Sequence, residues 1–353
     1  MESAQAPRRR KPPPGSNAIE RRNRLGTRRT PPRILGRMEI SSVVATAYGG
    51  PEVLSVVHST VNGPERGQVL IEVRSAGTNP VDYKLYSGAY GEDPANIPMS
   101  LGFEAAGVVK EVGGELHGPS GPISVGDEVI VYRTTGAYAS DILTPPDAVL
   151  PKPSSMSFEE AGGLMLAGVT AFHALTATGA TRGDTLLVHG AGGGVGLMAV
   201  QLAIADGVRV IGTASMGQHD HLRSLGVEPV LYGDGLAERI RTLAPQGVNA
   251  AIDLVGTDEA VEVSLELVAD SARIATIVST DRSRAEGVQA LGGGPGADAG
   301  VEIRQAARLE LIRRVDAGSL QVFIAGTYRL TDAAAAHRQL ASGHAHGKIV
   351  LVP

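Results

Sequence analysis

The chain has 353 residues, of which 42% are hydrophobic and 20% are charged, enough for one large or two ordinary folded domains. It contains no cysteine, which excludes disulfide bonds, thiol nucleophiles, iron–sulfur clusters and cysteine-bound zinc. The formal net charge of −5 is unevenly distributed: residues 1–37 contain eleven Arg or Lys against two Glu, which leaves −14 for residues 38–353.

Residues 1–37 are predicted to be a disordered basic extension, because prolines at 12–14 and 31–32 oppose a regular element. An acidic body repels nucleic-acid phosphates, so nucleic-acid binding is not expected outside this arm. The arm lacks the apolar region of a secretory signal, and we expect a cytoplasmic protein. Two uncharged stretches, 161–181 and 185–205, are long enough to span a bilayer. Five glycines interrupt the second and His173 lies in the first, so we expect no membrane span.

From residue 38 the chain reads as short β-branched runs separated by glycine and proline turns. Strands are expected at 42–46, 53–61, 68–74, 106–112 and 128–132. From about residue 158, apolar helical stretches alternate with strands beginning near 185, 208, 228, 249 and 273. Spacings of 20–24 residues between these five starts suit strand–helix units and a parallel sheet. Thr257 is predicted to cap a helix. A helix near 302–316 and a last strand at 348–352 follow, and that strand could return to the first domain.

The strongest local pattern is an apolar strand, 185–189, followed by a glycine cluster and an apolar helix that runs to about residue 206. Ala191-x-Gly193-x-x-Gly196 stands for the usual G-x-G-x-x-G of a dinucleotide site. Glycine allows the backbone to approach a pyrophosphate, and the start of the helix offers free N–H groups. The motif assigns phosphate binding to the segment Gly192, Gly193, Gly194 and Val195.

The second strand of this unit indicates which dinucleotide binds. NAD-binding proteins carry an acid about 20 residues after the glycine motif, where it accepts from the ribose 2′-hydroxyl. No acid occurs from Gly207 through His219, and Ser215 offers a small hydroxyl to a 2′-phosphate. NADPH is therefore the expected cofactor.

The sequence resembles the medium-chain dehydrogenase/reductase superfamily, in particular its zinc-free quinone oxidoreductase branch, the zeta-crystallin-like proteins. The motifs that carry this resemblance, besides the glycine loop, are Ala76-Gly-Thr-Asn-Pro-Val-Asp82, Leu101-Gly-Phe-Glu-Ala-Ala-Gly107, Val125-Gly-Asp-Glu-Val129 and Gly136-Ala-Tyr-Ala139. The resemblance implies an α/β fold: a GroES-like irregular β domain (38–160, completed by 287–353) and a Rossmann domain with a doubly wound parallel sheet (161–286). It also implies a homodimer that pairs through the Rossmann domain, with the strands near 249–278 as candidate interface elements.

The resemblance also implies site residues. Asn79 and Thr170 are expected near the nicotinamide end, Val255 at the carboxyl edge of the sheet, and Tyr232 against the adenosine phosphate; Lys348 matches a recurrent family feature. The residues after Asn79 line the substrate pocket, so Asn79, Tyr83 and Lys84 are the candidate catalytic donors. No metal is expected, because Phe103 stands where zinc-dependent members have a histidine.

Three functions remain open from the sequence. The first is an NADPH-dependent, metal-independent oxidoreductase that transfers hydride to a quinone or an α,β-unsaturated carbonyl compound. Such acceptors delocalise the developing charge and need no Lewis acid. The second is an enoyl-thioester reductase of the same fold. The third is a non-enzymatic, nucleotide-bound structural or RNA-associated protein.

Overall fold

The computed structural model describes residues 37–278, 280–294 and 296–353, so the predicted basic extension lies, except for Arg37, outside the described residues. A seven-stranded sheet dominates the N-terminal half. Its strand order is β10-β8-β5-β3-β18-β17, with β9 also pairing with β3. These strands are β3 (Val69–Gly77), β5 (Glu104–Val112), β8 (Glu128–Tyr132), β9 (Asp141–Thr144), β10 (Val149–Pro151), β17 (Ile324–Arg329) and β18 (Lys348–Val352).

Two smaller sheets accompany it. One has the order β2-β1-β4, and the other is the hairpin β6-β7. Their bounds are β1 (Met38–Ala45), β2 (Leu54–Val61), β4 (Met99–Ser100), β6 (Leu116–Gly118) and β7 (Gly121–Ile123). The strands expected from β-branched runs in this half are all confirmed, within a few residues at their ends.

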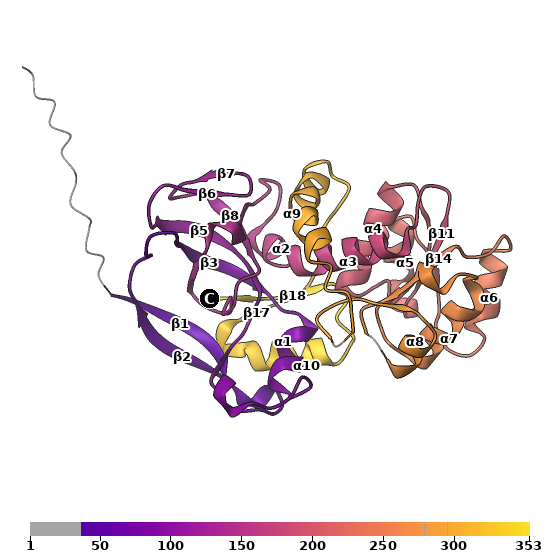
Figure 1. Ribbon diagram of the computed structural model, residues 1–353, viewed down its shortest axis with the longest axis horizontal. Helices are drawn as coiled ribbons and strands as arrows, with labels where there is room; N and C mark the ends of the chain where they lie inside the picture. Colours follow the sequence, from indigo (N-terminus) through magenta and orange to yellow (C-terminus); the bar gives the residue numbers. More distant parts are fainter. Residues whose placement is uncertain (1–36, 279, 295) are drawn as a thin grey trace, which may run out of the picture. The chain divides into compact units, whose positions relative to one another are not determined.

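The last strand belongs to this N-terminal sheet. β18 pairs antiparallel with β3 and parallel with β17, so the chain does return to its first domain. Figure 1 shows the yellow β17, β18 and helix α10 (Ala333–Ala341) among the indigo and purple N-terminal elements. Both chain ends contribute to one apolar core, in which Ile349 and Leu351 pack with Val69 and Ile71.

The middle of the chain forms a parallel sheet with the order β13-β12-β11-β14-β15-β16. Its strands are β11 (Thr185–His189), β12 (Arg209–Thr213), β13 (Glu228–Val230), β14 (Ala250–Asp253), β15 (Ile274–Thr276) and β16 (Gln289–Ala290). Helices alternate with them: α4 (Gly194–Ala205), α5 (His219–Ser224), α6 (Leu236–Leu243), α7 (Asp258–Leu267) and α8 (Asp281–Ala285). The Thr257 hydroxyl caps α7, as predicted. The expected α/β class, an irregular β domain plus a doubly wound parallel sheet, is confirmed.

Helices α2 (Phe158–Gly162), α3 (Met165–Thr178) and α9 (Val301–Asp316) connect the two sheets. A shared apolar cluster contains Ile130 of β8, Met165 of α3, Met198 of α4 and Leu311 of α9. Helices α3 and α9 pack closely because Gly168 leaves room for Leu311: a Cβ at residue 168 would lie 2.7 Å from Leu311 Cδ1. Helix α1 (Pro80–Tyr86) closely follows β3 in the chain.

Six short 3₁₀ turns complete the described chain: Pro51–Val53, Pro94–Asn96, Pro146–Ala148, Met216–Gln218, Ser271–Arg273 and Leu330–Asp332. None of the helices within the described ranges is long and apolar enough to cross a membrane.

Candidate active site

The glycine loop between β11 and α4 forms a cradle of partly buried backbone. Gly190 has φ +76°, a conformation that favours glycine, and a Cβ at Gly196 would lie only 2.2 Å from the Gly190 carbonyl oxygen. Gly193 caps α4 without any side-chain hydrogen bond. The first N–H groups of the helix therefore have no intrahelical partner and point, with the positive end of the helix dipole, into the loop. This geometry suits a pyrophosphate.

Ser215 and Tyr232 leave the neighbouring strands side by side. The Ala214 N–H donates to the Val230 carbonyl at 3.1 Å, so the two segments that follow begin together. Tyr232 is 53% exposed. Beside it, the Arg239 guanidinium donates to three main-chain carbonyls of the loop 231–234. The rim therefore combines a hydroxyl, an exposed aromatic ring and a nearby cation.

At the ends of β14 and β15, Asp253 holds the next segment in place. One of its carboxylate oxygens accepts the N–H groups of Val255 and Gly256, each at 2.9 Å, and the other accepts the Thr276 hydroxyl at 2.9 Å. Val255 is 45% exposed. Its side chain lies against the glycine loop, because a Cβ at Gly190 would be 2.7 Å from Val255 Cγ1.

Between the two sheets lies a buried cluster of charged and polar groups centred on Lys348. Its ammonium donates to the Thr78 carbonyl at 3.0 Å, to Asn79 Oδ1 at 2.5 Å and to Glu104 Oε1 at 3.1 Å. The Asn79 amide donates to the same Glu104 oxygen at 2.9 Å. The second Glu104 oxygen accepts the Leu166 N–H, just inside α3, at 2.8 Å. The side chains of Asn79, Glu104 and Lys348 are each 4% exposed or less and thus serve as hydrogen-bond partners for one another.

The aliphatic part of Lys348 connects this cluster to the glycine loop. A Cβ at Gly194 would lie 3.1 Å from Lys348 Cδ, and one at Gly163 would lie 3.1 Å from Lys348 Cβ. The phosphate cradle and the Asn79–Glu104–Lys348 cluster are therefore adjacent. Thr170, which is buried on α3, lies on the helix whose first turn is bonded to Glu104.

A second buried network starts at Asp82 in the first turn of α1. Asp82 Oδ2 accepts the Asn79 N–H and the Tyr138 hydroxyl, each at 2.7 Å, so Asp82 does serve as a helix cap. His337 of α10 lies 3.2 Å from the Tyr138 oxygen through Nε2 and 2.8 Å from the Tyr86 oxygen through Nδ1. Within the described chain, Asp82 Oδ1 is buried without a hydrogen-bond partner.

Burial dominates the proton equilibria of this network. It raises the pKa of Asp82 to about 7, although the Tyr138 hydroxyl, the Asn79 N–H and the Lys348 charge oppose the shift. It lowers the pKa of His337 to about 4, so His337 is neutral at physiological pH. With Nε2 protonated, His337 donates to Tyr138 and Tyr138 donates to Asp82, so the hydrogen bonds of this network all run in one direction.

The predicted site residues fall into two groups. In the first group, the side chains of Asn79 and Lys348 are hydrogen-bonded to each other. Gly194 lies against Lys348, and Val255 lies against Gly190. Tyr83 and Lys84 are half-buried on α1, and no hydrogen bond of either side chain is found among the described residues. Burial raises the pKa of the Tyr83 hydroxyl, which keeps it protonated and able to donate.

Sequence reasoning missed Glu104, Tyr138 and His337 as site-forming residues. Each had a signal: Glu104 directly precedes the apolar run 105–109, Tyr138 lies between two alanines, and His337 follows four alanines. A polar group in such surroundings is buried and needs a partner. No group of three His, Asp or Glu side chains that could hold a metal ion occurs within the described ranges.

Two family models match the chain: the alcohol dehydrogenase GroES-like domain at residues 65–154 and the zinc-binding dehydrogenase at residues 225–351. The quinone oxidoreductase of Mus musculus is 29% identical over 334 residues, which cover 90% of this chain and 99% of that protein. Several other quinone oxidoreductases match at 36% identity, and there the aligned segment spans about half to two thirds of their length.

Solved structures agree with this assignment. A mycobacterial protein in complex with NADPH is 30% identical, with a TM-score of 0.76, and the match covers 89% of this chain and 100% of that one. Escherichia coli quinone oxidoreductase complexed with NADPH is 28% identical at the same coverage, also with a TM-score of 0.76. The fold is that of a medium-chain dehydrogenase/reductase. Within that superfamily, the chain belongs to the quinone oxidoreductase family.

Asp82→Asn tests the buried carboxylate. As pH rises from about 4 to 7, the unfolded chain loses this proton before the folded one, so Asp82 makes the folded state progressively less stable. The variant lacks this decline, while the opposite contribution of His337 is present in both proteins. Between pH 5 and 8, the free energy of unfolding of Asp82→Asn should therefore rise relative to wild type by on the order of 2 kcal/mol.

Urea unfolding at four pH values measures this difference. Asp316→Asn, at the exposed end of α9, is the control for loss of one surface carboxylate. A difference between Asp82→Asn and wild type that does not change with pH would contradict the shifted proton equilibrium.

Proposed function

We propose that this protein is an NADPH-dependent, metal-independent reductase of quinones or α,β-unsaturated carbonyl compounds. One observation carries the proposal: the phosphate cradle at Gly194 and the buried Asn79–Glu104 cluster share Lys348, so a dinucleotide bound at the first would end at the second. This arrangement supports an oxidoreductase over a protein that only stores a nucleotide.

The residues fit the cofactor along its whole length. The backbone of Gly192, Gly193, Gly194 and Val195 would hold the pyrophosphate, and a Cβ at Gly193 would meet only the Gly190 carbonyl, at 3.5 Å. Ser215 and Tyr232 would border the adenosine end. Thr170, Val255, Asn79 and Lys348 would border the nicotinamide. When bound, NADPH supplies the hydride.

Residues of α1 would stabilise the negative charge that develops on the substrate oxygen. Asn79 uses its amide within the buried cluster, so we assign it to positioning. The Lys84 ammonium and the Tyr83 hydroxyl have no partners among the described residues and are free to donate to that oxygen. A donor aimed at developing negative charge is worth most where water is excluded.

Metal independence rests on the ligands available. The chain has no cysteine. Phe103 precedes Glu104, and Glu104 is already engaged with Lys348 and Asn79. A quinone or enone acceptor delocalises negative charge onto oxygen, where hydrogen-bond donors suffice.

Oxidation of NADPH, followed at 340 nm with a panel of quinones, enones and enoyl thioesters, tests the activity. We expect turnover with quinones or enones that is unchanged after incubation with a chelator. Loss of activity on chelation and its return with zinc would contradict the metal-free mechanism. No turnover with any acceptor would favour the non-enzymatic alternative, and turnover of thioesters alone would favour the enoyl-thioester reductase.

NADPH should bind more tightly than NADH, because the segment after β12 offers Ser215 and no acid to the 2′ position. Titration of the purified protein by quenching of nucleotide fluorescence measures both affinities. Ser215→Asp provides the matched variant: its carboxylate would repel the 2′-phosphate and should reverse the preference. Equal or tighter NADH binding by wild type would contradict the inference.

Lys84→Ala should reduce kcat modestly, by about tenfold, and leave the affinity for NADPH nearly unchanged. Removing a donor costs ~10²–10³ in rate at a dry site, and less where water substitutes at a half-buried one. Lys110→Ala serves as the control, since its ammonium is paired with Asp141 at 2.7 Å on another strand. An unchanged kcat for Lys84→Ala would remove Lys84 from the reaction.

A further inference from the structure

Two arginines from different elements converge beside β8. Arg133 follows β8 directly and donates through Nη1 to Gln305 Oε1 of α9 at 3.0 Å. Arg304, the preceding residue of α9, donates through Nε to His173 Nδ1 at 3.3 Å. Both charges act on the same hydroxyl: burial raises the pKa of Tyr132, and the positive charges of Arg304 and Arg133 oppose that shift.

This pair borders the reaction end of the site. Tyr132 is directly opposite Glu104 in the β5–β8 ladder, and Glu104 holds Asn79 and Lys348. The Arg133 N–H donates to the carbonyl of Phe103, the residue before Glu104, at 3.1 Å. On the other side, the partner of Arg304 is His173, one helical turn beyond Thr170 on α3.

Neither guanidinium is neutralised by direct contact. Within the described part of the chain, no carboxylate oxygen lies within 4 Å of Arg133 or Arg304. The charge of Asp298 acts on Arg304 from beyond 4 Å, and the two side chains are linked by contact through His173, whose Nε2 lies 3.1 Å from Asp298 Oδ2. The terminal nitrogens of Arg304 remain for the Tyr132 hydroxyl and for a ligand.

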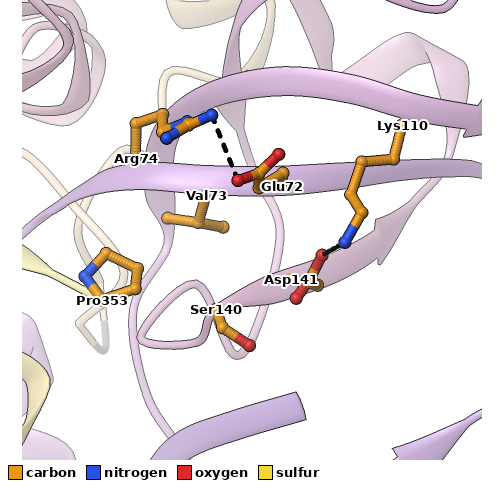
Figure 2. Close-up of a pocket in the computed structure, with 7 residues that line it drawn as sticks. All are labelled: Glu72, Val73, Arg74, Lys110, Ser140, Asp141 and Pro353. Atoms are coloured by element: carbon orange, nitrogen blue, oxygen red, sulfur yellow. Dashed lines mark hydrogen bonds and ion pairs between the residues drawn. The ribbon is translucent and has the colours of Figure 1, made fainter. Parts of the chain in front are cut away.

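A surface hollow on β3 provides the contrast. It has a volume of about 300 Å³ and is also lined by two cations, Arg74 and Lys110. Figure 2 shows each of them turned toward an acid, Arg74 toward Glu72 at 3.1 Å and Lys110 toward Asp141 at 2.7 Å. Each cation of that hollow is in a direct ion pair, whereas Arg133 and Arg304 form none within the described part of the chain.

The backbone fixes where each of the two arginines lies. Arg133 has φ +66°, and it is the one non-glycine residue with positive φ in the described chain. This conformation is disfavoured for a side-chain-bearing residue. Helix α9, which carries Arg304, begins at Gly300 without a side-chain cap from that residue, and the Gly300 N–H donates to Asp298 Oδ1 at 2.9 Å.

Resting on the proposed function, we infer that Arg133 and Arg304 select substrates that carry a carboxylate in addition to the reducible quinone or enone. A guanidinium matches a carboxylate in geometry and charge, and two of them at the edge of the site would orient the acceptor with its reactive carbon toward the nicotinamide. Arg133 and Arg304 are thus specificity residues, separate from the donors Tyr83 and Lys84.

A matched pair of enones isolates the charge: 4-oxo-2-pentenoic acid and its methyl ester, each assayed with NADPH. Their intrinsic reactivities differ, so the informative quantity is the acid-to-ester ratio of kcat/KM, compared between proteins. Arg133→Gln should lower this ratio about tenfold relative to wild type, mainly through KM of the acid, and Arg304→Gln should act in the same direction. Arg133→Lys should retain part of the ratio, and Arg74→Gln should leave it unchanged.

Salt provides a second measurement that does not depend on the folding of any variant. In wild type, KM of the acid should rise between 50 and 500 mM NaCl, while KM of the ester should not. Turnover of the ester with an acid-to-ester ratio unaffected by both substitutions would overturn this inference and leave the proposed function intact. No NADPH oxidation with this pair or with any other acceptor would overturn the proposed function, and this inference with it.

Discussion

The site depends on one buried ion pair, that of Lys348 with Glu104. Burying either charge alone is strongly unfavourable, and removing one partner of such a pair typically costs about 3–5 kcal/mol. The pair is tolerable because Thr78, Asn79 and Leu166 complete the hydrogen bonds of both groups. The last strand, the central strands of the first sheet and the start of α3 are therefore held in one arrangement. The pair thereby fixes the relative positions of the residues around Asn79.

Asn79 belongs to two networks of different character. Its side chain is part of the charged cluster, whereas its main-chain N–H is bound by Asp82, whose other partner Tyr138 leads to His337. The first network fixes where the amide lies and the second fixes how α1 starts. All these groups are saturated with internal partners except one oxygen of Asp82. Under the proposed function, the side chains that would act on a substrate are those of Tyr83 and Lys84 on α1 and of the two arginines beside Tyr132.

Features that depend on neighbours in sequence could be predicted. The strand, glycine turn and helix around Gly193 carry a pattern within about twenty residues, and the Thr257 cap is read from three. The partners of Glu104 could not be predicted in this way, because Asn79 and Lys348 are 25 and 244 residues away and no periodicity links them to Glu104. The same holds for Tyr138 and His337, 199 residues apart. A buried polar residue is visible in a sequence, but the group that satisfies it depends on tertiary packing.

The position of β18 has a consequence for how the protein is made. The parallel sheet is built from one continuous stretch of chain, so it can form as that stretch leaves the ribosome. The first sheet cannot be completed then, since its central strand β3 waits for a neighbour synthesised some 270 residues later. Until that strand arrives, the end of β3 at Ala76 and Gly77 lacks its partner, although β9 can already pair with residues 69–72, and Glu104 has no counter-ion. The strands that carry the glycine loop are therefore complete before the Lys348–Glu104 pair forms, and a dinucleotide bound at that stage would lie beside a first sheet that still lacks its last strands.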